Sequence, residues 1–336
     1  MMKSPVTVLA LGGTIAMTAG EEGGVVPTLS GESLVAAVPG LEDVAEVDAW
    51  SFRQLPGAHL RYEDLEKLAE TIGGLEASGQ RGVVVTQGTD TIEETAFALD
   101  RLLEPGMPVV VTGAMRNPMV AGADGPANLL GAIRVAVSDE ARGSGCLVVL
   151  NDEIHAARFV RKTHTSRLDA FRSPLCGRIG WVSEGLVQMG CALPRVPAIP
   201  MTGVGSGKRT ALVTIAMGDD GDPIRALESL RYDGLVVEAT GGGHVPPDVA
   251  DALGEVAQRI PVVLASRAGA GQVLEKTYGF PGSEIDLQRR GLIRAGWLDG
   301  LKAKVLLTLL LRHGVGGYDA VCEAFRPWGG GGGKAP

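Results

Sequence analysis

The feature that most constrains the fold is the stretch 83–91, which reads VVVTQGTDT. Three consecutive valines predict a strand that is buried on both faces, as in a parallel sheet. A polar loop with one glycine follows, and then a helical pattern begins in which Thr91 and Glu94 are placed as a capping box. In an open α/β sheet, the ligand crevice lies at the carboxyl ends of the strands. Thr89 and Asp90 therefore sit where chemistry is expected, although such residues also commonly cap helices.

A second strand predicts a matching loop. Residues 6–11 form another apolar run, which leads directly into Gly12 and Gly13 and then Thr14. Two glycines let the backbone turn sharply and approach a ligand closely, so Thr14 is presented at the end of its strand. The same alternation of strand, loop and helix recurs along the chain, which predicts an α/β protein with mainly parallel sheets.

These two loops resemble the signatures of the bacterial-type L-asparaginase family, which read roughly TGGTIA and HGTDT. Residues 11–16 read LGGTIA and residues 87–91 read QGTDT, so each motif departs from the family in its first residue. The threonines and the aspartate that carry the family's chemistry are present as Thr14, Thr89 and Asp90. Similar family motifs continue along nearly the whole chain, from Val6 to about Phe325.

The resemblance implies a two-domain asparaginase-like fold. We expect a larger N-terminal catalytic domain at 1–195, with a mobile flap at 17–30, and a smaller C-terminal α/β domain at 210–328. The linker is placed at 196–209, where prolines and glycines are dense. Residues 329–336 are rich in glycine and predict a flexible tail outside the fold.

Lys162 has two interpretations. It lies in a basic run between Arg158 and Arg167, and such runs are usually solvated faces. The family motif RxxxKTxT, however, aligns with Arg158, Lys162, Thr163 and Thr165, and in the family this lysine is buried against the aspartate of the second signature. We therefore expect Lys162 to lie beside Asp90.

Together these residues provide the chemistry for acyl transfer from an amide. A threonine hydroxyl is a weak nucleophile and needs a proton acceptor beside it. If Lys162 and Asp90 form a buried pair, desolvation favours the neutral amine, which can accept a proton from Thr89 or a water. Backbone N–H groups at the helix N-terminus can stabilise an oxyanion. By the family's pattern Thr14 attacks the side-chain carboxamide, ammonia leaves, and water promoted by Thr89 hydrolyses the acyl-enzyme. The resemblance implies no metal and no organic cofactor.

The substrate-binding positions depart from the family pattern. The resemblance places substrate contacts at Ala58, His59, Gly88, Thr89, Asp90, Ala114 and His244. Ala58 and His59 stand where the family has the serine and glutamine that hold the substrate's α-carboxylate, and His244 replaces an asparagine that reaches a neighbouring subunit's active site. Val25 occupies the position of a flap tyrosine.

Composition excludes other classes. The chain has 336 residues with 39 acidic and 31 basic side chains, a net charge of −8, and no basic cluster interleaved with aromatics, which argues against nucleic-acid binding. No apolar run reaches the length of a membrane span. The four cysteines and five histidines lack metal-ligand spacing. We expect a cytoplasmic homo-oligomer, a dimer or tetramer, that acts on a small-molecule amide.

Three functions remain open. The first is an L-asparaginase with a variant α-carboxylate site. The second is an amidohydrolase of the same fold that acts on glutamine, D-asparagine or a substituted asparagine. The third is a non-enzymatic amino-acid-binding protein, but a pure binder has no need of a lysine and an aspartate beside two threonines.

Overall fold

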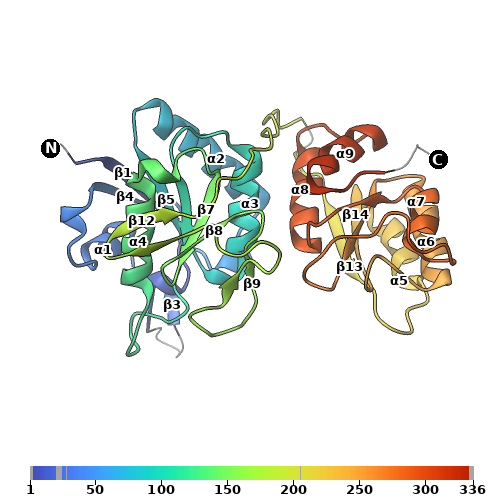
Figure 1. Cartoon of the computed structure of the whole chain (residues 1–336), viewed down its shortest axis with the longest axis horizontal. Helices are drawn as coiled ribbons and strands as arrows, with labels where there is room; N and C mark the ends of the chain where they lie inside the picture. Colours follow the sequence, from blue (N-terminus) through green and yellow to red (C-terminus); the bar gives the residue numbers. More distant parts are fainter. Residues whose placement is uncertain (1–2, 20–24, 28, 205, 333–336) are drawn as a thin grey trace. The chain divides into compact units, whose positions relative to one another are not determined.

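The computed structural model describes residues 3–19, 25–27, 29–204 and 206–332. The chain forms two compact units, Met1–Ala198 and Ile199–Pro336 (Figure 1). The first contains an eight-stranded sheet and the second a four-stranded sheet, each combined with helices. The predicted α/β class is therefore confirmed.

The large sheet of the first unit has the strand order β12-β11-β8-β7-β6-β5-β1-β4. Its strands are β1 (Pro5–Ala10), β4 (Glu46–Ser51), β5 (Gly82–Thr86), β6 (Val109–Thr112), β7 (Cys146–Leu150), β8 (Glu153–Ala156), β11 (Gly180–Ser183) and β12 (Leu186–Met189). The five strands from β4 to β7 are parallel, and the remaining pairings are antiparallel. The central β5 is buried along its whole length, as its three valines predict.

Helices cover both faces of this sheet. They are α1 (Gly31–Ala36), α2 (Tyr62–Ala77), α3 (Ile92–Leu102) and α4 (Gly125–Val137). Val84 and Val110 share a core cluster with α4 residues such as Ile133. Because side chains alternate along a strand, the neighbouring valines Val83 and Val85 face the other side. Figure 1 shows α2 and α3 on the opposite side of the sheet from α4.

Short elements at the ends of these strands position the candidate site. They are the 3₁₀ turns η1 (Thr14–Ala16), η3 (Gly57–His59) and η4 (Thr89–Thr91), and the strand pairs β2 (Met17–Ala19) with β3 (Val25–Pro27) and β9 (Arg161–Lys162) with β10 (Phe171–Arg172). The predicted flap therefore includes a short antiparallel pair. Its residues 20–24 and 28 lie outside the described part of the chain.

The second unit has a parallel sheet in the order β13-β14-β15-β16. Its strands are β13 (Thr210–Thr214), β14 (Gly234–Ala239), β15 (Val262–Ser266) and β16 (Ile293–Arg294). Its helices are α5 (Asp222–Ala226), α6 (Pro247–Ala257), α7 (Glu284–Arg289), α8 (Gly300–Arg312) and α9 (Tyr318–Phe325). The apolar side chains of α6 pack into the same core cluster as Leu235 and Val237 of β14.

Buried charges fix the start of the predicted linker to the first unit. Asp100 is 2% exposed and accepts a hydrogen bond from Arg101 at 2.7 Å. Arg101 also donates to the carbonyl of Val196 at 3.2 Å, and Arg158 donates to the carbonyl of Pro194 at 2.8 Å. Arg158 is therefore a buried anchor, and its basic run is not a uniformly solvated face.

The prediction that 329–336 take no part in the fold is wrong for residues 329–332. The backbone of Gly331 exchanges two hydrogen bonds with that of Arg294, at 2.8 and 3.0 Å, next to the fully buried Trp328. The glycines are required for this close packing, because a Cβ on Gly330 would lie 2.2 Å from the Arg294 carbonyl oxygen. Low-complexity composition here reflects backbone contact and was misread as flexibility. Residues 333–336 lie outside the described part of the chain.

Candidate active site

The Thr14 loop and the Thr89 loop lie in contact, because glycines allow their backbones to touch. Gly13 has a φ of +84°, and a Cβ at this position would lie 2.0 Å from the backbone nitrogen of Gly88. No side chain fits in that space, so glycine is required at residue 13. Thr14, half-buried, opens η1 immediately after this contact. The two strand-end loops that carry Thr14 and Thr89 are therefore in contact.

Thr91 joins a third turn to the same place. Its hydroxyl donates to the carbonyl of Gly57 at 3.1 Å and accepts from the Gln87 amide at 3.3 Å. The predicted capping box with Glu94 is wrong, since Thr91 is the N-cap residue of α3 but makes no side-chain cap. The hydroxyl is used to hold η3 beside η4.

Lys162 reaches both residues of the second signature. Its Nζ donates to Thr89 Oγ1 at 2.9 Å and to Asp90 Oδ1 at 2.6 Å. The lysine side chain is 13% exposed, whereas that of Asp90 is 74% exposed, so the pair lies at the edge of the site with the amine on its inner side. The structure therefore excludes the solvated-face interpretation for Lys162, but the carboxylate is not buried as expected.

Glu93 is a residue of this site that the sequence reasoning missed. Its carboxylate accepts a hydrogen bond from the backbone N–H of Lys162 at 3.2 Å, and the side chain is 5% exposed. Because Glu93 lies in the first turn of α3, it ties β9 to the helix that begins just after Asp90. The available signal in the sequence was its position, three residues after Asp90 at the start of the predicted helix.

The other predicted substrate contacts of the first unit surround the two threonines. Ala58 and His59 are exposed on η3, where a Cβ on Gly57 would lie 3.0 Å from the Gly88 carbonyl oxygen. Ala114 follows β6 and is 1% exposed. Its neighbour Gly113 is so close that a Cβ there would lie 3.3 Å from Thr89 Cγ2. The candidate site is therefore assembled from the ends of β1, β5 and β6 together with η3 and β9.

His244 belongs to the second unit, in the turn after β14. Its Nε2 lies 3.2 Å from Glu284 Oε2, and its ring packs edge-on against Tyr278 and Phe280. Burial of Glu284 favours the neutral acid, but hydrogen bonds from the backbone of Tyr278 and Thr277 and from His244 outweigh it and lower the pKa of this carboxyl. The contribution of His244 to the site remains a prediction.

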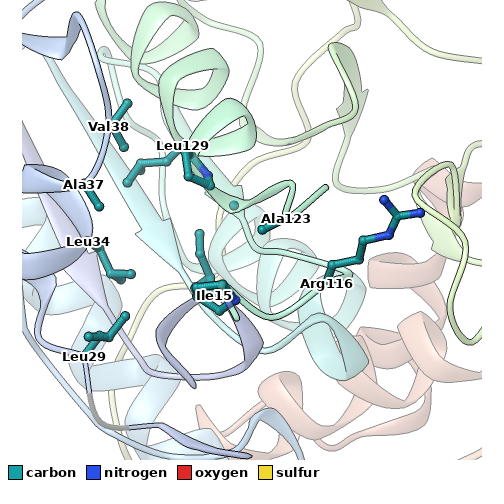
Figure 2. A pocket seen from close by; sticks show the side chains of 11 residues that line it. Ile15, Leu29, Leu34, Ala37, Val38, Arg116, Ala123 and Leu129 are labelled. Atoms are coloured by element: carbon teal, nitrogen blue, oxygen red, sulfur yellow. The ribbon is translucent and has the colours of Figure 1, made fainter. Parts of the chain in front are cut away.

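An apolar cavity of about 240 Å³ lies behind the Thr14 loop (Figure 2). Ile15, Leu34 and Leu129 line it, and Figure 2 shows the Arg116 guanidinium directed away from them. Gly125 separates the cavity from Ala114, since a Cβ there would lie 3.0 Å from Ile15 and 3.5 Å from the Ala114 Cβ. Apart from Arg116, the side chains that line the cavity are apolar, so we place the chemistry on the polar side of the Thr14 loop.

The described ranges contain neither a metal-binding cluster nor a membrane-spanning helix. Among these residues no group of three or more histidine, cysteine, aspartate or glutamate side chains is placed to hold a metal ion. In the same part of the chain, no helix combines the length and apolar character needed to cross a bilayer.

Comparison with known proteins identifies the family. Residues 5–193 match the family model described as Asparaginase, N-terminal, and residues 209–325 match the Glutaminase/Asparaginase C-terminal domain. The chain therefore belongs to the asparaginase family, and the prediction made from its two motifs is confirmed.

Relatives match over nearly their whole length. A probable L-asparaginase of Deinococcus radiodurans is 39% identical over 92% of this chain and 93% of its own. An L-asparaginase of Bacillus licheniformis is 34% identical over 92% and 96%. The crystal structure of a probable cytoplasmic L-asparaginase from Campylobacter jejuni, 32% identical, superposes with a TM-score of 0.87 over 96% of this chain and 99% of that one. The predicted two-domain asparaginase-like fold is confirmed.

Proposed function

We propose that the protein is an amidohydrolase that releases ammonia from the side-chain amide of L-asparagine and forms L-aspartate. The observation that carries this proposal is the Lys162 amino group, which bridges Thr89 and Asp90 within hydrogen-bond distance and next to the Thr14 loop. A nucleophile, a proton acceptor and a group that orients the acceptor are the components that acyl transfer needs. Relatives named as L-asparaginases support the same reaction.

In the proposed mechanism Thr14 Oγ1 bonds to the carboxamide carbon, the proton of its hydroxyl passes to the amide nitrogen, and the C–N bond breaks, so ammonia leaves. The lysine amine then accepts a proton from the attacking water through Thr89 Oγ1, which lies 2.9 Å away. The water oxygen bonds to the acyl carbon, the ester bond to Thr14 Oγ1 breaks, and the lysine returns the proton to Thr14 as aspartate is released. Asp90 holds the lysine in place through the 2.6 Å contact. No metal or organic cofactor takes part.

The choice of L-asparagine is the less constrained part of the proposal. Ala58 offers no side-chain donor for an α-carboxylate, whereas the exposed His59 can supply a ring N–H. A site with one donor fewer binds the amino acid more weakly, so a same-fold amidohydrolase acting on glutamine, D-asparagine or a substituted asparagine is the second candidate.

The domain roles and the assembly follow from the same proposal. Residues 1–195 form the catalytic domain, 196–209 the linker and 210–328 the second domain. The protein acts as a homo-oligomer, a dimer or tetramer, in which the turn before His244 completes a neighbouring subunit's site. The Campylobacter protein is named as cytoplasmic, and we propose the same compartment here. Light scattering that shows a fully active monomer would overturn the assembly.

The threonine variants test the reaction. Thr14→Val and Thr89→Val keep the side-chain shape and remove the hydroxyl, so we expect ammonia release to collapse while the melting temperature changes little. Thr71→Val, on α2, where the hydroxyl donates to the Lys67 carbonyl of the same helix, is the control and should leave turnover largely intact. Near-normal turnover in Thr14→Val would refute the threonine mechanism.

A further inference from the structure

Two polar side chains at the start of α4 hold the Ala114 loop in place. Asp124 Oδ2 accepts the backbone N–H of Met115 at 3.0 Å, and Asp124 Oδ1 accepts that of Arg116 at 2.8 Å. Asn128, one helical turn later, donates from Nδ2 to Asp124 Oδ2 at 3.0 Å and to the Gly113 carbonyl at 2.9 Å. The two side chains therefore grip the backbone on both sides of Ala114.

Asn128 uses both donors and the acceptor oxygen of its side-chain amide. Besides the two donor contacts, its Oδ1 accepts the backbone N–H of Asn151 at 2.9 Å, and the side chain is 5% exposed. Asn151 follows β7 in a left-handed conformation with a φ of +53°. Asn128 therefore joins the chain after β6 to the chain after β7, from a helix that packs on both strands.

Helix capping does not account for Asp124. It occupies the N-cap position of α4, but its side chain makes no cap hydrogen bond. An aspartate at this position ordinarily bonds to the first turn of its own helix. Here both carboxylate oxygens face the Met115–Arg116 backbone and Asn128 instead.

The backbone N–H and C=O of Ala114 lie between the positions that Asp124 and Asn128 hold. Among the residues that the structure describes, none hydrogen-bonds to the backbone N–H or C=O of Ala114, although the residue is 1% exposed. Buried backbone polar groups are nearly always paired, so two groups that no described residue pairs are suited to bind a ligand. A primary carboxamide carries both a donor and an acceptor and matches them.

We propose that Asp124 and Asn128 are positioning residues that hold the Ala114 backbone at the place where it binds the carboxamide of the substrate; this inference rests on the proposed amidohydrolase function. The Thr89 methyl group lies against Gly113, so the same clamp sets the distance between the carboxamide and Thr89. Displacement of such a contact by about 1 Å can lower turnover by about a hundredfold.

The first test is Asn128→Asp, which keeps the shape and replaces both donors by an acceptor facing Asp124 and the Gly113 carbonyl. We expect kcat to fall by about a hundredfold and backbone amide exchange in a peptide spanning 113–118 to become faster. Ile133→Ala is the control, because Ile133 lies fully buried on the same helix and its side chain has no hydrogen-bonding group. It should lower the melting temperature and leave kcat and exchange at 113–118 unchanged at 25 °C. If Asn128→Asp does not fold, Asp124→Asn carries the same expectation.

The second test exchanges the two side chains in Asp124→Asn with Asn128→Asp. The exchange restores a donor and an acceptor between the two positions but leaves a carboxylate against the Gly113 carbonyl. If Asp124 and Asn128 are positioning residues, the double variant should regain the melting temperature lost in the single variant but not its kcat. Recovery of both would overturn the inference, as would an Asn128→Asp single variant with normal kcat. A wild-type enzyme that releases no ammonia from any amide would instead refute the proposed function.

Discussion

The change Lys162→Met separates catalysis from stability most sharply. Methionine has a similar length and apolar stem but cannot donate to Thr89 Oγ1 at 2.9 Å or to Asp90 Oδ1 at 2.6 Å. If the lysine is the proton acceptor, its loss should lower turnover by about 10²–10⁴-fold. At 1.36 kcal/mol for each factor of ten, this corresponds to about 2.7–5.4 kcal/mol of transition-state stabilisation.

The stability cost of the same change should be much smaller. The Asp90 side chain is 74% exposed, so its charge remains solvated when the ammonium group is removed. Ion pairs with an exposed partner typically contribute about 0.2–1 kcal/mol. Whether the Lys162–Asp90 pair is structural or catalytic, Lys162→Met should lower the free energy of unfolding only slightly. A large loss of kcat is expected only if the pair is catalytic.

The assay is steady-state ammonia release from L-asparagine together with urea denaturation of the same preparations. Arg161→Met is the matched control, since it removes a neighbouring cation of the same basic run from the same short strand. We expect kcat to fall at least a hundredfold in Lys162→Met and less than threefold in Arg161→Met. Near-full activity of Lys162→Met would refute the proton-acceptor role, and equal losses in both variants would show that β9 acts only through its charge.

Three further predictions follow. Asp100→Asn breaks a buried ion pair with Arg101 and should lower the free energy of unfolding, measured by urea denaturation, by about 3–5 kcal/mol. A loss below about 1 kcal/mol, which is the range of a surface ion pair, would contradict a structural role for this buried pair. Burial lowers the pKa of His155 below its usual 6.5, so the neutral histidine stabilises the fold above that pH, and this contribution is lost as the pH falls through 6.5 toward the folded-state pKa. The difference in melting temperature between wild type and His155→Gln should therefore shrink from pH 8 to pH 5, and a constant difference would contradict this. The control Ser173→Ala keeps the histidine and should show the same pH dependence as wild type. Ala58→Ser restores a hydrogen-bond donor to the substrate's α-carboxylate, and a hydrogen bond to a charged group contributes about 1.5–3 kcal/mol. The KM for L-asparagine should therefore fall roughly ten- to hundredfold with kcat nearly unchanged. An already low KM in the unmodified protein would contradict this prediction.

Local sequence patterns were sufficient to predict the strand and the turn that carry the site residues. The three valines before Thr86 predict a central buried strand, and the paired glycines before Thr14 predict a sharp turn, because these preferences depend on a few consecutive residues. The contact between Gly13 and Gly88 then follows from adjacent parallel strands. The motif resemblance added Lys162, which composition alone would have assigned to a solvated run.

Tertiary contacts decided what the sequence could not show. Thr91 is placed to cap α3, but its hydroxyl bonds to Gly57, 34 residues away. Asn128 looks like an ordinary polar residue of a helix, and its partners Gly113 and Asn151 belong to two other loops. Gly330 looks like part of a flexible tail, but a backbone carbonyl fills the space that a side chain would need.

The most direct test of the central claim is ammonia release by the unmodified protein across a panel of L-asparagine, D-asparagine, L-glutamine and asparagine blocked at its α-amino or α-carboxyl group. The account predicts that L-asparagine is turned over fastest, with one aspartate formed for each ammonia and no dependence on added metal or chelator. Faster turnover of glutamine, D-asparagine or a blocked asparagine would contradict the substrate assignment. Absence of ammonia release from every amide would contradict the claim that the geometry of Thr14, Thr89, Asp90 and Lys162 is that of an amidohydrolase.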